Sequence, residues 1–463
     1  MRVLKFGGSS LADAERIRRA MDIVIRRREA FGPVVLVLSA MKGVTDALLD
    51  ASFAAAKGDE RYRERFSEIL ERTERVREEL VPGDSEVFED TDRFLEELSD
   101  LLRGVMLVRE CSPRTRDLIL SFGERLNCRV CAGYLTSLGL SARYVDSRPL
   151  VRTDAAFGAA RVDFGTTYGQ LRQALEGFDG VAVVTGFIGS TVEGVTTTIG
   201  RNGSDYTASL VGAALGAESI EIWTDVDGVL SADPNLVPDA FVVPELSYSE
   251  AVELSYFGAR VIHPSTMLPA IEKEIPLWIK NTLNEDAPGT RITKSGGGRK
   301  RTITGIASIE HVALINVEGG GMVGLPGIAS RIFRALADAA VNIIMISQAS
   351  SEHSICIVCD ETSAPRALGS LETELTQELA TRTIDQFELI GDLEIVAVIG
   401  ANMRGTPGIS GRLFSALGEA GVNVLAIAQG SSEMNISFVV QGSDRALALN
   451  TVHRAFFGSE DRR

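Results

Sequence analysis

The chain has 463 residues, of which 45% are hydrophobic and 24% charged, and its formal net charge is -16. This length exceeds one ordinary hydrophobic core and predicts two or three domains. The acidic balance argues against non-specific binding to nucleic acid or to an anionic membrane. No apolar run approaches the ~18 residues that span a bilayer, and the N-terminus lacks a leader-like segment, so we expect a cytoplasmic protein.

The strands expected first in chain order are VLKF, PVVLVLSA, ARYVDS, VAVVTGFI and SIEIWTDV, and segments with helical periodicity separate them. This alternation predicts an α/β domain over residues 1–295 with a mainly parallel sheet. Ligands bind beyond the carboxyl ends of the strands in such sheets.

Residues 58–110 depart from the alternation, because they are rich in Glu and Arg and carry leucines at helical spacing, such as Leu95, Leu98 and Leu102. The segment VPGDS supplies a turn in their middle. We therefore expect a helical hairpin packed on the outside of the domain, with a solvated charged face over an apolar stripe.

Two CxxC spacings occur, Cys128/Cys131 and Cys356/Cys359, among five cysteines in all. The second lies in HSICIVC, a predicted strand in which residues three apart face opposite sides. The first lies in an apolar helical run with no histidine nearby. We interpret both pairs as buried small hydrophobic residues, and we expect neither a disulfide framework nor a protein-held metal.

A glycine-rich basic segment, TKSGGGRKR at 293–301, is the best linker candidate. An internal repeat that begins at Gly321 follows it, in which GLPGIASRIF matches GTPGISGRLF at a constant offset of 81 residues. Each copy predicts a strand, a Pro-Gly turn, an amphipathic helix and two strands. We expect two small α+β domains at 302–383 and 384–463, either separate or interleaved, with a binding or assembly role.

The N-terminal segment KFGGSS follows the first predicted strand and raises a choice of interpretation. Lys5 offers a positive charge, and the amides of Gly7-Gly8 can approach an anion because no Cβ obstructs them. Ser9 and Ser10 open a helix whose N-terminus also favours negative charge. The spacing of a P-loop is absent, so the segment alone fits either a phosphate site or a helix-capping turn with a surface lysine.

Three further segments favour the ligand site, because each follows a predicted strand. VLSAMKGVTDALL places the hydroxyls of Ser39 and Thr45 around a loop, and TIGRNGSDYTASL places Arg201 and Asp205 at the start of a helix. IEIWTDVDGVLSADPN ends a buried strand in Thr-Asp and then turns.

In order along the chain, KFGGSS, SFGERLN, GRNGSDYTA, WTDVDGV, ELSYFGARVIHP and IKNTLNEDAPGT resemble the motifs of the aspartate kinases in the amino-acid kinase family. The likeness is greatest to the kinase half of the bifunctional aspartokinase–homoserine dehydrogenases, and the C-terminal repeats look like their ACT domains. The resemblance implies an amino-acid-kinase fold, a mainly parallel sheet sandwiched by helices, followed by two ferredoxin-like ACT domains.

The resemblance also implies ATP-dependent phosphorylation of the L-aspartate side-chain carboxylate to 4-phospho-L-aspartate, the first step of lysine, threonine and methionine synthesis. It implies Mg²⁺ held through ATP oxygens and water. Matched motif by motif, the catalytic residues are Lys5 and Asp205. The ATP-binding residues are Lys5, Gly7, Gly8, Ser9, Thr224, Asp225, Leu230, Asn235, Arg260 and Val261, and the aspartate-binding residues are Ser39, Thr45, Glu124, Arg201, Gly203 and Ser204.

The chemistry of aspartate agrees with those roles. Glu124 suits the ammonium group, and Arg201 suits the α-carboxylate as a bidentate fork. The attacking carboxylate has a solution pKa of about 3.9, so it is ionised at neutral pH and needs no general base. We therefore interpret Asp205 as the residue that organises Lys5, and we expect Lys5, helix N-termini and Mg²⁺ to offset the repulsion between two anions.

Three positions depart from the family pattern: Leu230 replaces a tyrosine, Asn235 an arginine and Arg260 a lysine. All three belong to the nucleotide side. They leave room for a second hypothesis, a catalytically silent amino-acid sensor that keeps the fold. A third hypothesis is a related kinase acting on another acceptor, such as glutamate or UMP.

The ACT-like repeats imply regulation by an amino acid, with L-threonine favoured and L-lysine second, and a homodimer or larger assembly of identical chains. The alternative is that the repeats only dimerise the kinase. The residues expected at the effector are Met322, Leu325, Gly327, Ile328, Asn342, Ile343, Gln348, Asn423 and Gln429.

Overall fold

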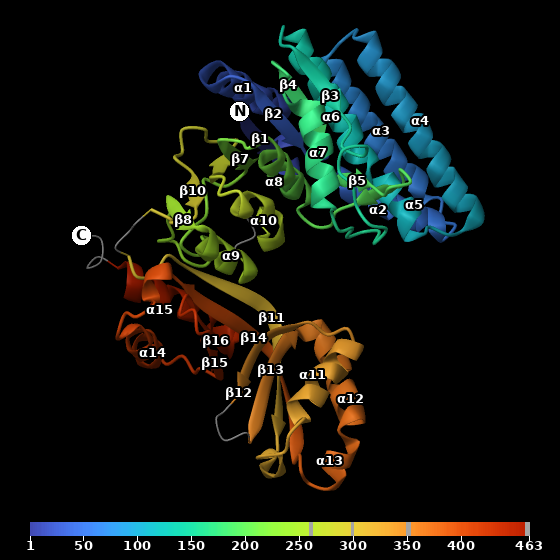
Figure 1. The fold of residues 1–463 in the computed structure, drawn as a ribbon. Helices are drawn as coiled ribbons and strands as arrows, with labels where there is room; N and C mark the ends of the chain where they lie inside the picture. Colours follow the sequence, from blue (N-terminus) through green and yellow to red (C-terminus); the bar gives the residue numbers. More distant parts are fainter. Residues whose placement is uncertain (259–262, 298–300, 349–352, 459–463) are drawn as a thin grey trace. The chain divides into compact units, whose positions relative to one another are not determined.

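The computed structural model describes residues 1–258, 263–297, 301–348 and 353–458. The chain divides into two compact units (Figure 1). The first contains residues 1–229 and 244–248 with the described part of 261–297. The second contains residues 230–243 with the described parts of 249–260 and 298–463.

An eight-stranded sheet with the order β3-β4-β2-β1-β7-β9-β10-β8 forms the centre of the first unit. Its neighbouring strands are parallel except for the antiparallel pair β9 and β10, which confirms the mainly parallel sheet. The strands are β1 (Arg2–Phe6), β2 (Val34–Leu38), β3 (Ala142–Val145), β4 (Val181–Thr185), β7 (Ser219–Thr224), β8 (Glu245–Ser247), β9 (Leu277–Asn281) and β10 (Thr290–Thr293). Every residue of β2 and β4 is buried, as their unbroken apolar runs predict for central parallel strands.

Helices connect these strands and cover the sheet (Figure 1). They are α1 (Ala14–Phe31), α2 (Val44–Ala56), α5 (Pro113–Leu120), α6 (Phe122–Ser137), α7 (Phe164–Leu175), α8 (Gly203–Leu215) and α10 (Pro264–Glu272). A short 3-10 turn, η1 (Gly8–Leu11), separates β1 from α1. Side chains cap several of these helices; Asp13, for instance, accepts a hydrogen bond from the backbone N–H of Arg16 at the start of α1.

The expected helical hairpin is present as α3 (Arg61–Leu80) and α4 (Ser85–Val108). Leu95, Leu98, Leu102 and Val105 are buried in the same core cluster as β1 and β2, so the leucine spacing did mark the packed face. The CxxC residues Cys128 and Cys131 are buried in this core on α6. Among the described residues, no helix combines the length and the apolar character needed to cross a membrane.

A six-stranded antiparallel sheet with the order β12-β13-β11-β14-β16-β15 forms the second unit. Its strands are β11 (Gly305–Glu318), β12 (Ile343–Gln348), β13 (Ser354–Asp360), β14 (Gln386–Ile399), β15 (Ala426–Ala428) and β16 (Asn435–Gln441). Its helices are α11 (Ile328–Asp338), α12 (Ala364–Glu374), α13 (Thr376–Ala380), α14 (Ile409–Glu419) and α15 (Arg445–Phe457). The expected order of strand, turn, helix, strand and strand is present in both repeats.

The two repeats share their longest strands. The first part of β11, at 305–309, pairs with the end of β14 beside β16, whereas its second part, at 312–318, pairs with the start of β14 beside β13. The register shifts between Ile309 and Val312, where His311 has a φ of 55°. Each long strand therefore completes the sheet of both repeats.

Two segments before the expected linker belong to the second unit, which differs from the single domain expected over residues 1–295. In the first, Ala232 and Val237 join the core of the second repeat, and the Ser231 hydroxyl lies 3.0 Å from His453 Nε2. The second lies within α9 (Tyr248–Tyr256), where Tyr256 donates a hydrogen bond to the carbonyl of Ile344. The expected linker begins at the end of β10, and its residues 298–300 lie outside the described residues.

Candidate active site

The glycine segment after β1 is held at the carboxyl end of the central sheet. Gly7 donates its N–H to the carbonyl of Trp223 on β7, over 3.2 Å, and the buried Ser10 hydroxyl lies 2.7 Å from that of Thr282. The two contacts fix η1 next to the ends of β7 and β9. The amides of this segment are therefore presented at the edge where parallel sheets bind ligands.

Lys5 is the cation of this edge. Only 8% of the residue is exposed, and its Nζ lies 2.6 Å from Asp205 Oδ1 at the start of α8. A Cβ placed on Gly7 would lie 3.4 Å from Lys5 Nζ, so the ammonium is directly beside the glycine segment. The ion pair fixes the position of the Lys5 ammonium, and the organising role of Asp205 in the reaction stays a prediction.

The start of α8 packs tightly against the loop that follows β4. Cβ atoms on Gly186 and Gly203 would lie 2.6 Å from the Ser204 side chain and 2.7 Å from Phe187, so neither position has room for a larger residue. Arg201 is exposed just ahead of the helix, and none of the ion pairs among the described residues involves it. Its guanidinium is therefore available to a ligand.

Glu124 on α6 is the most unusual carboxylate of the site. It is 3% exposed, and its Oε1 accepts a hydrogen bond from the backbone N–H of Ala40 over 3.1 Å. Its Oε2 is buried and has no hydrogen-bond partner among the described residues. Burial raises the pKa of Glu124 to about 8, only partly offset by the Ala40 N–H. A cationic ligand group would satisfy the free oxygen and restore the charge.

Ser39 and Thr45 lie on the loop and helix that follow β2. Ser39 donates its N–H to the carbonyl of Phe6 on β1, and its own carbonyl accepts a hydrogen bond from Asn127 over 2.7 Å. Thr45 is half-buried in the first turn of α2. The structure thus brings Lys5, Ser39 and Glu124 to one edge of one sheet, although they come from three distant parts of the chain.

The structure describes only some of the residues that the sequence assigns to ATP. Thr224 ends β7, and its hydroxyl donates to the exposed Asp225. Leu230 and Asn235 belong to the second compact unit, where Leu230 bridges to Val242 and Asn235 bonds to Asp233. Arg260 and Val261 lie outside the described residues. The roles of these four residues at ATP therefore stay predictions.

Three residues of this edge were not identified from the sequence. Asn127 bonds to Ser39, Asp227 accepts hydrogen bonds from Asn281 and Asn284, and Asp117 ties down the segment ahead of Arg201. Asn127 lies within SFGERLN, so the motif itself was a usable signal. Asp227 likewise lies within WTDVDGV, whereas Asp117 acts through partners that are 41 and 81 residues away, which no local pattern reveals.

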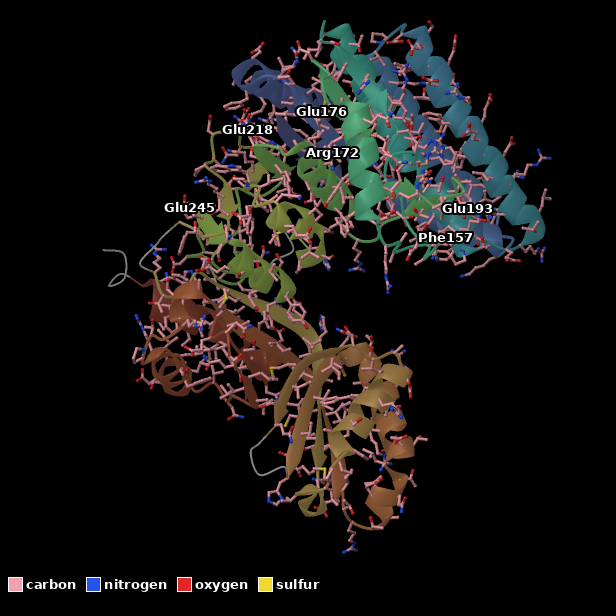
Figure 2. All side chains as sticks on the ribbon, viewed as in Figure 1. Phe157, Arg172, Glu176, Glu193, Glu218 and Glu245 are labelled. Carbon is pink, nitrogen blue, oxygen red and sulfur yellow. The ribbon has the colours of Figure 1, made fainter. Side chains whose placement is uncertain are left out.

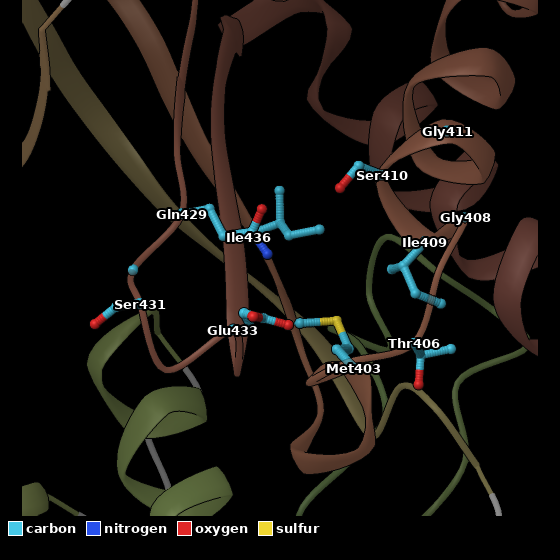
Figure 3. A pocket seen from close by; sticks show the side chains of 11 residues that line it. Met403, Thr406, Gly408, Ile409, Ser410, Gly411, Gln429, Ser431, Glu433 and Ile436 are labelled. Atoms are coloured by element: carbon cyan, nitrogen blue, oxygen red, sulfur yellow. The ribbon is translucent and has the colours of Figure 1, made fainter.

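A separate pocket of about 590 Å³ lies in the second repeat (Figure 3). At an offset of 81 residues, five of its lining residues match Met322, Leu325, Gly327, Ile328 and Gln348, which the sequence assigns to the effector. The pocket residues are Met403, Thr406, Gly408, Ile409, Ser410, Gly411, Gln429, Gly430, Ser431, Glu433 and Ile436. Gln429 thus lines the pocket, whereas Asn423 does not. The positions of the first repeat that correspond to Gly430, Ser431 and Glu433 fall within 349–352, which lie outside the described residues.

Two family models match the chain. The amino acid kinase family matches residues 1–281, and the ACT domain matches residues 315–375 and 396–456. The chain is 36% identical to aspartokinase 1, chloroplastic, of Arabidopsis thaliana, over 99% of this chain and 80% of that protein. The chain belongs to the amino acid kinase family and, within it, to the aspartokinases.

The bifunctional aspartokinase/homoserine dehydrogenase 1 of the same plant is 36% identical over 98% of this chain. The match covers 51% of that relative, so the chain spans about half its length. Among solved structures, Escherichia coli aspartokinase III in complex with aspartate and ADP superposes with a TM-score of 0.81, at 29% identity over 99% of this chain and all of that one. The same enzyme in complex with lysine and aspartate gives 0.78 at 30% identity, over 99% of both chains.

Proposed function

We propose that this chain transfers the γ-phosphoryl group of ATP to the side-chain carboxylate of L-aspartate, yielding 4-phospho-L-aspartate and so feeding lysine, threonine and methionine synthesis. The proposal rests on the charged groups that meet at the carboxyl edge of the central sheet. A buried lysine beside a glycine segment faces the same edge as a buried glutamate with one free oxygen. The solved relative that binds aspartate and ADP supports the choice of substrates.

The chain's own groups account for the steps. Lys5 and the amides of Gly7 and Gly8 would neutralise the transferring phosphate. Glu124 would hold the aspartate ammonium, and Arg201 the α-carboxylate. Mg²⁺ would be held by ATP oxygens and water, where it supplies further positive charge. The nucleophile is already ionised, so these residues orient reactants and offset charge without moving a proton.

A hydroxylamine trap tests this reaction. The wild type, given Mg-ATP, should form hydroxamate with aspartate and not with glutamate, and UMP should not be phosphorylated. Lys5→Ala should lower kcat by roughly 10²–10³-fold, the usual effect of removing one transition-state donor. Lys57→Ala, at an exposed lysine on the end of α2, is the matched control and should be unchanged.

No product from any acceptor would favour the silent sensor, and product from another acceptor would favour the third hypothesis. Near-normal turnover in Lys5→Ala would contradict the phosphate role of this edge.

We further propose that the second-repeat pocket and its counterpart in the first repeat bind an amino-acid effector, L-threonine ahead of L-lysine. Glu433 supplies a carboxylate for the ammonium, and its Oε2 already accepts the N–H of Gly405 over 2.8 Å. The N-terminus of α14 suits the effector carboxylate, and Thr406, Ser410 and Ser431 offer hydroxyls for a small polar side chain. The relative that binds lysine supports an amino-acid ligand.

Gln429→Ala should weaken threonine binding to the second-repeat pocket by roughly tenfold, because one hydrogen bond to a charged or polar group is lost. Titration calorimetry measures the change, and Gln377→Ala, on a helix of the first repeat, is the control. Unaltered threonine affinity would contradict the pocket assignment, and tighter lysine binding would reverse the effector order. Assembly into a homodimer and a cytoplasmic location stay predictions from the sequence.

A further inference from the structure

The helical hairpin, which the reaction does not use directly, reaches two loops of the candidate active site. Arg72 lies on α3, and its Nη1 donates a hydrogen bond to the carbonyl of Lys42 over 2.6 Å. Its Nη2 donates to the carbonyl of Ala12 over 2.5 Å. One guanidinium therefore joins two segments that are 30 residues apart in the chain.

Each of the two carbonyls belongs to a loop with an assigned role. Ala12 directly follows η1, the 3-10 turn of the glycine segment, and Lys42 lies between Ala40 and the start of α2. The N–H of Ala40 bonds to Glu124. The two loops touch at this point, because a Cβ on Gly8 would lie 3.0 Å from the carbonyl oxygen of Ala40 and 3.4 Å from the backbone of Lys42.

Arg72 bonds to these two backbone carbonyls and to no carboxylate among the described residues. None of the ion pairs among the described residues involves it, in contrast to Arg65 and Arg77 on the same helix. Charged donors form the stronger hydrogen bonds to carbonyl groups, and a planar guanidinium fixes the direction of both bonds at once. The spacing of the two loops is thereby set from outside the sheet.

We propose that Arg72 is a positioning residue for phosphoryl transfer, which fixes the distance between the phosphate-binding glycine segment and the loop that supports the aspartate site. The inference rests on the proposed function, since it assumes that these loops hold ATP and aspartate. Displacement of reacting groups by about 1 Å can lower a rate by roughly 10²-fold. Arg72 bonds to the backbone of the two loops and is not among the residues assigned to ATP or aspartate, so its removal should act on turnover more than on substrate binding.

An open pocket of about 610 Å³ lies against Arg72 and allows a rescue experiment. Acidic side chains line it, with Asp13, Glu15, Glu68, Glu71 and Glu79 among them. A free guanidinium ion would be attracted to this pocket and could occupy the space that Arg72→Ala vacates. Urea has a similar shape but no charge, so it serves as the matched control for rescue.

Arg72→Ala should lower kcat in the hydroxylamine assay by about tenfold to a hundredfold, with a smaller change in KM for either substrate. Millimolar guanidinium should restore most of the loss, whereas urea should not. Arg72→Lys should recover part of the activity, because an ammonium can replace one of the two bonds but not the planar fork. Arg75→Ala, at an exposed position of the same helix with no hydrogen bond or ion pair to either loop among the described residues, should behave as wild type.

Hydrogen exchange provides a readout that does not need the reaction. The amides of residues 7–12 and 40–44 should exchange faster in Arg72→Ala and slow again with guanidinium, while the core strands stay protected. Wild-type kcat with wild-type exchange would overturn the inference, as would a loss that guanidinium leaves unchanged. A wild-type protein that forms no acyl phosphate would instead overturn the proposed function, and the exchange data would still decide the role of Arg72.

Discussion

Glu124 carries the clearest pH dependence of any single residue in the site. Burial raises its pKa from 4.5 to about 8, so in the free protein it is protonated at neutral pH. An ammonium at its free oxygen would favour the ionised form, so aspartate binding should release a proton below pH 8. Apparent aspartate affinity should therefore improve with rising pH, by at most about tenfold per unit, and level off above pH 8.

Calorimetry in buffers of different ionisation enthalpy measures that proton release. Glu124→Gln should abolish it and raise KM for aspartate by roughly tenfold or more, because the charged partner of the ammonium is lost. Glu110→Gln, at an exposed glutamate, is the matched control. A proton release that persists in Glu124→Gln would show that another group titrates.

The same residue affects stability without ligand. The folded chain holds the Glu124 proton up to about pH 8, whereas the unfolded chain loses it near 4.5. The folded state therefore binds more protons between these values, and its stability should fall as pH rises through that window. Saturating aspartate should remove the fall, because it stabilises the ionised form.

At the scale of elements, the β5–β6 hairpin depends on one buried carboxylate. β5 (Ile188–Ser190) and β6 (Thr196–Thr198) precede Arg201, and the fully buried Asp117 accepts hydrogen bonds from the N–H and the hydroxyl of Thr198 and from the N–H of Gly158. These bonds anchor the segment that leads into α8. Figure 2 shows Glu193 at the tip of the hairpin and Phe157 on the neighbouring segment.

Asp117→Asn should lower the free energy of unfolding by about 1–3 kcal/mol. The NH₂ group of the asparagine would replace one of the two oxygens that accept hydrogen bonds from Gly158 and Thr198. The substitution should also raise KM for aspartate, since Arg201 loses its support. Denaturant unfolding and steady-state kinetics measure the two effects. Glu193→Gln, at a fully exposed carboxylate of the same hairpin, should change neither. Full stability in Asp117→Asn would show that the hairpin does not depend on this anchor.

Most elements were predictable because their signals are local. Unbroken apolar runs marked β2 and β4, the leucine spacing marked α4, and the 81-residue offset marked both repeats. Lys5, Glu124 and Asp205 were placed through motif resemblance, and the structure brings them to one edge. Arg72 and Asp117 could not be found in this way, because their roles arise from bonds to backbone groups of distant segments.

The whole molecule is organised by a division that the sequence did not reveal. Helix α9 follows β8 of the kinase unit in the chain, yet its residues 249–256 cluster with the ACT repeats. Glu250 Oε1 accepts hydrogen bonds from the Thr304 hydroxyl and from the N–H of Ala401, two residues before Met403 of the second-repeat pocket. Asn435, next to Ile436 of that pocket, donates to Glu253.

Residues next to the second-repeat pocket are therefore bonded to a helix that is continuous in sequence with the kinase unit. Glu250→Ala should raise the threonine concentration for half-inhibition by roughly fivefold or more, with basal kcat nearly unchanged. Inhibition curves measure this, and Glu419→Ala, at an exposed position of α14, is the control. An unchanged curve would show that α9 does not carry the response.

In the proposed reaction, the segment after β1 neutralises the terminal phosphate of ATP while the aspartate carboxylate approaches it. A crystal structure with Mg²⁺, a non-hydrolysable ATP analogue and aspartate tests this most directly. The terminal phosphate should lie within hydrogen-bonding distance of Lys5 Nζ and the Gly7-Gly8 amides, with the aspartate ammonium at Glu124 Oε2. A triphosphate bound away from Lys5, or an aspartate ammonium that avoids Glu124, would contradict the account.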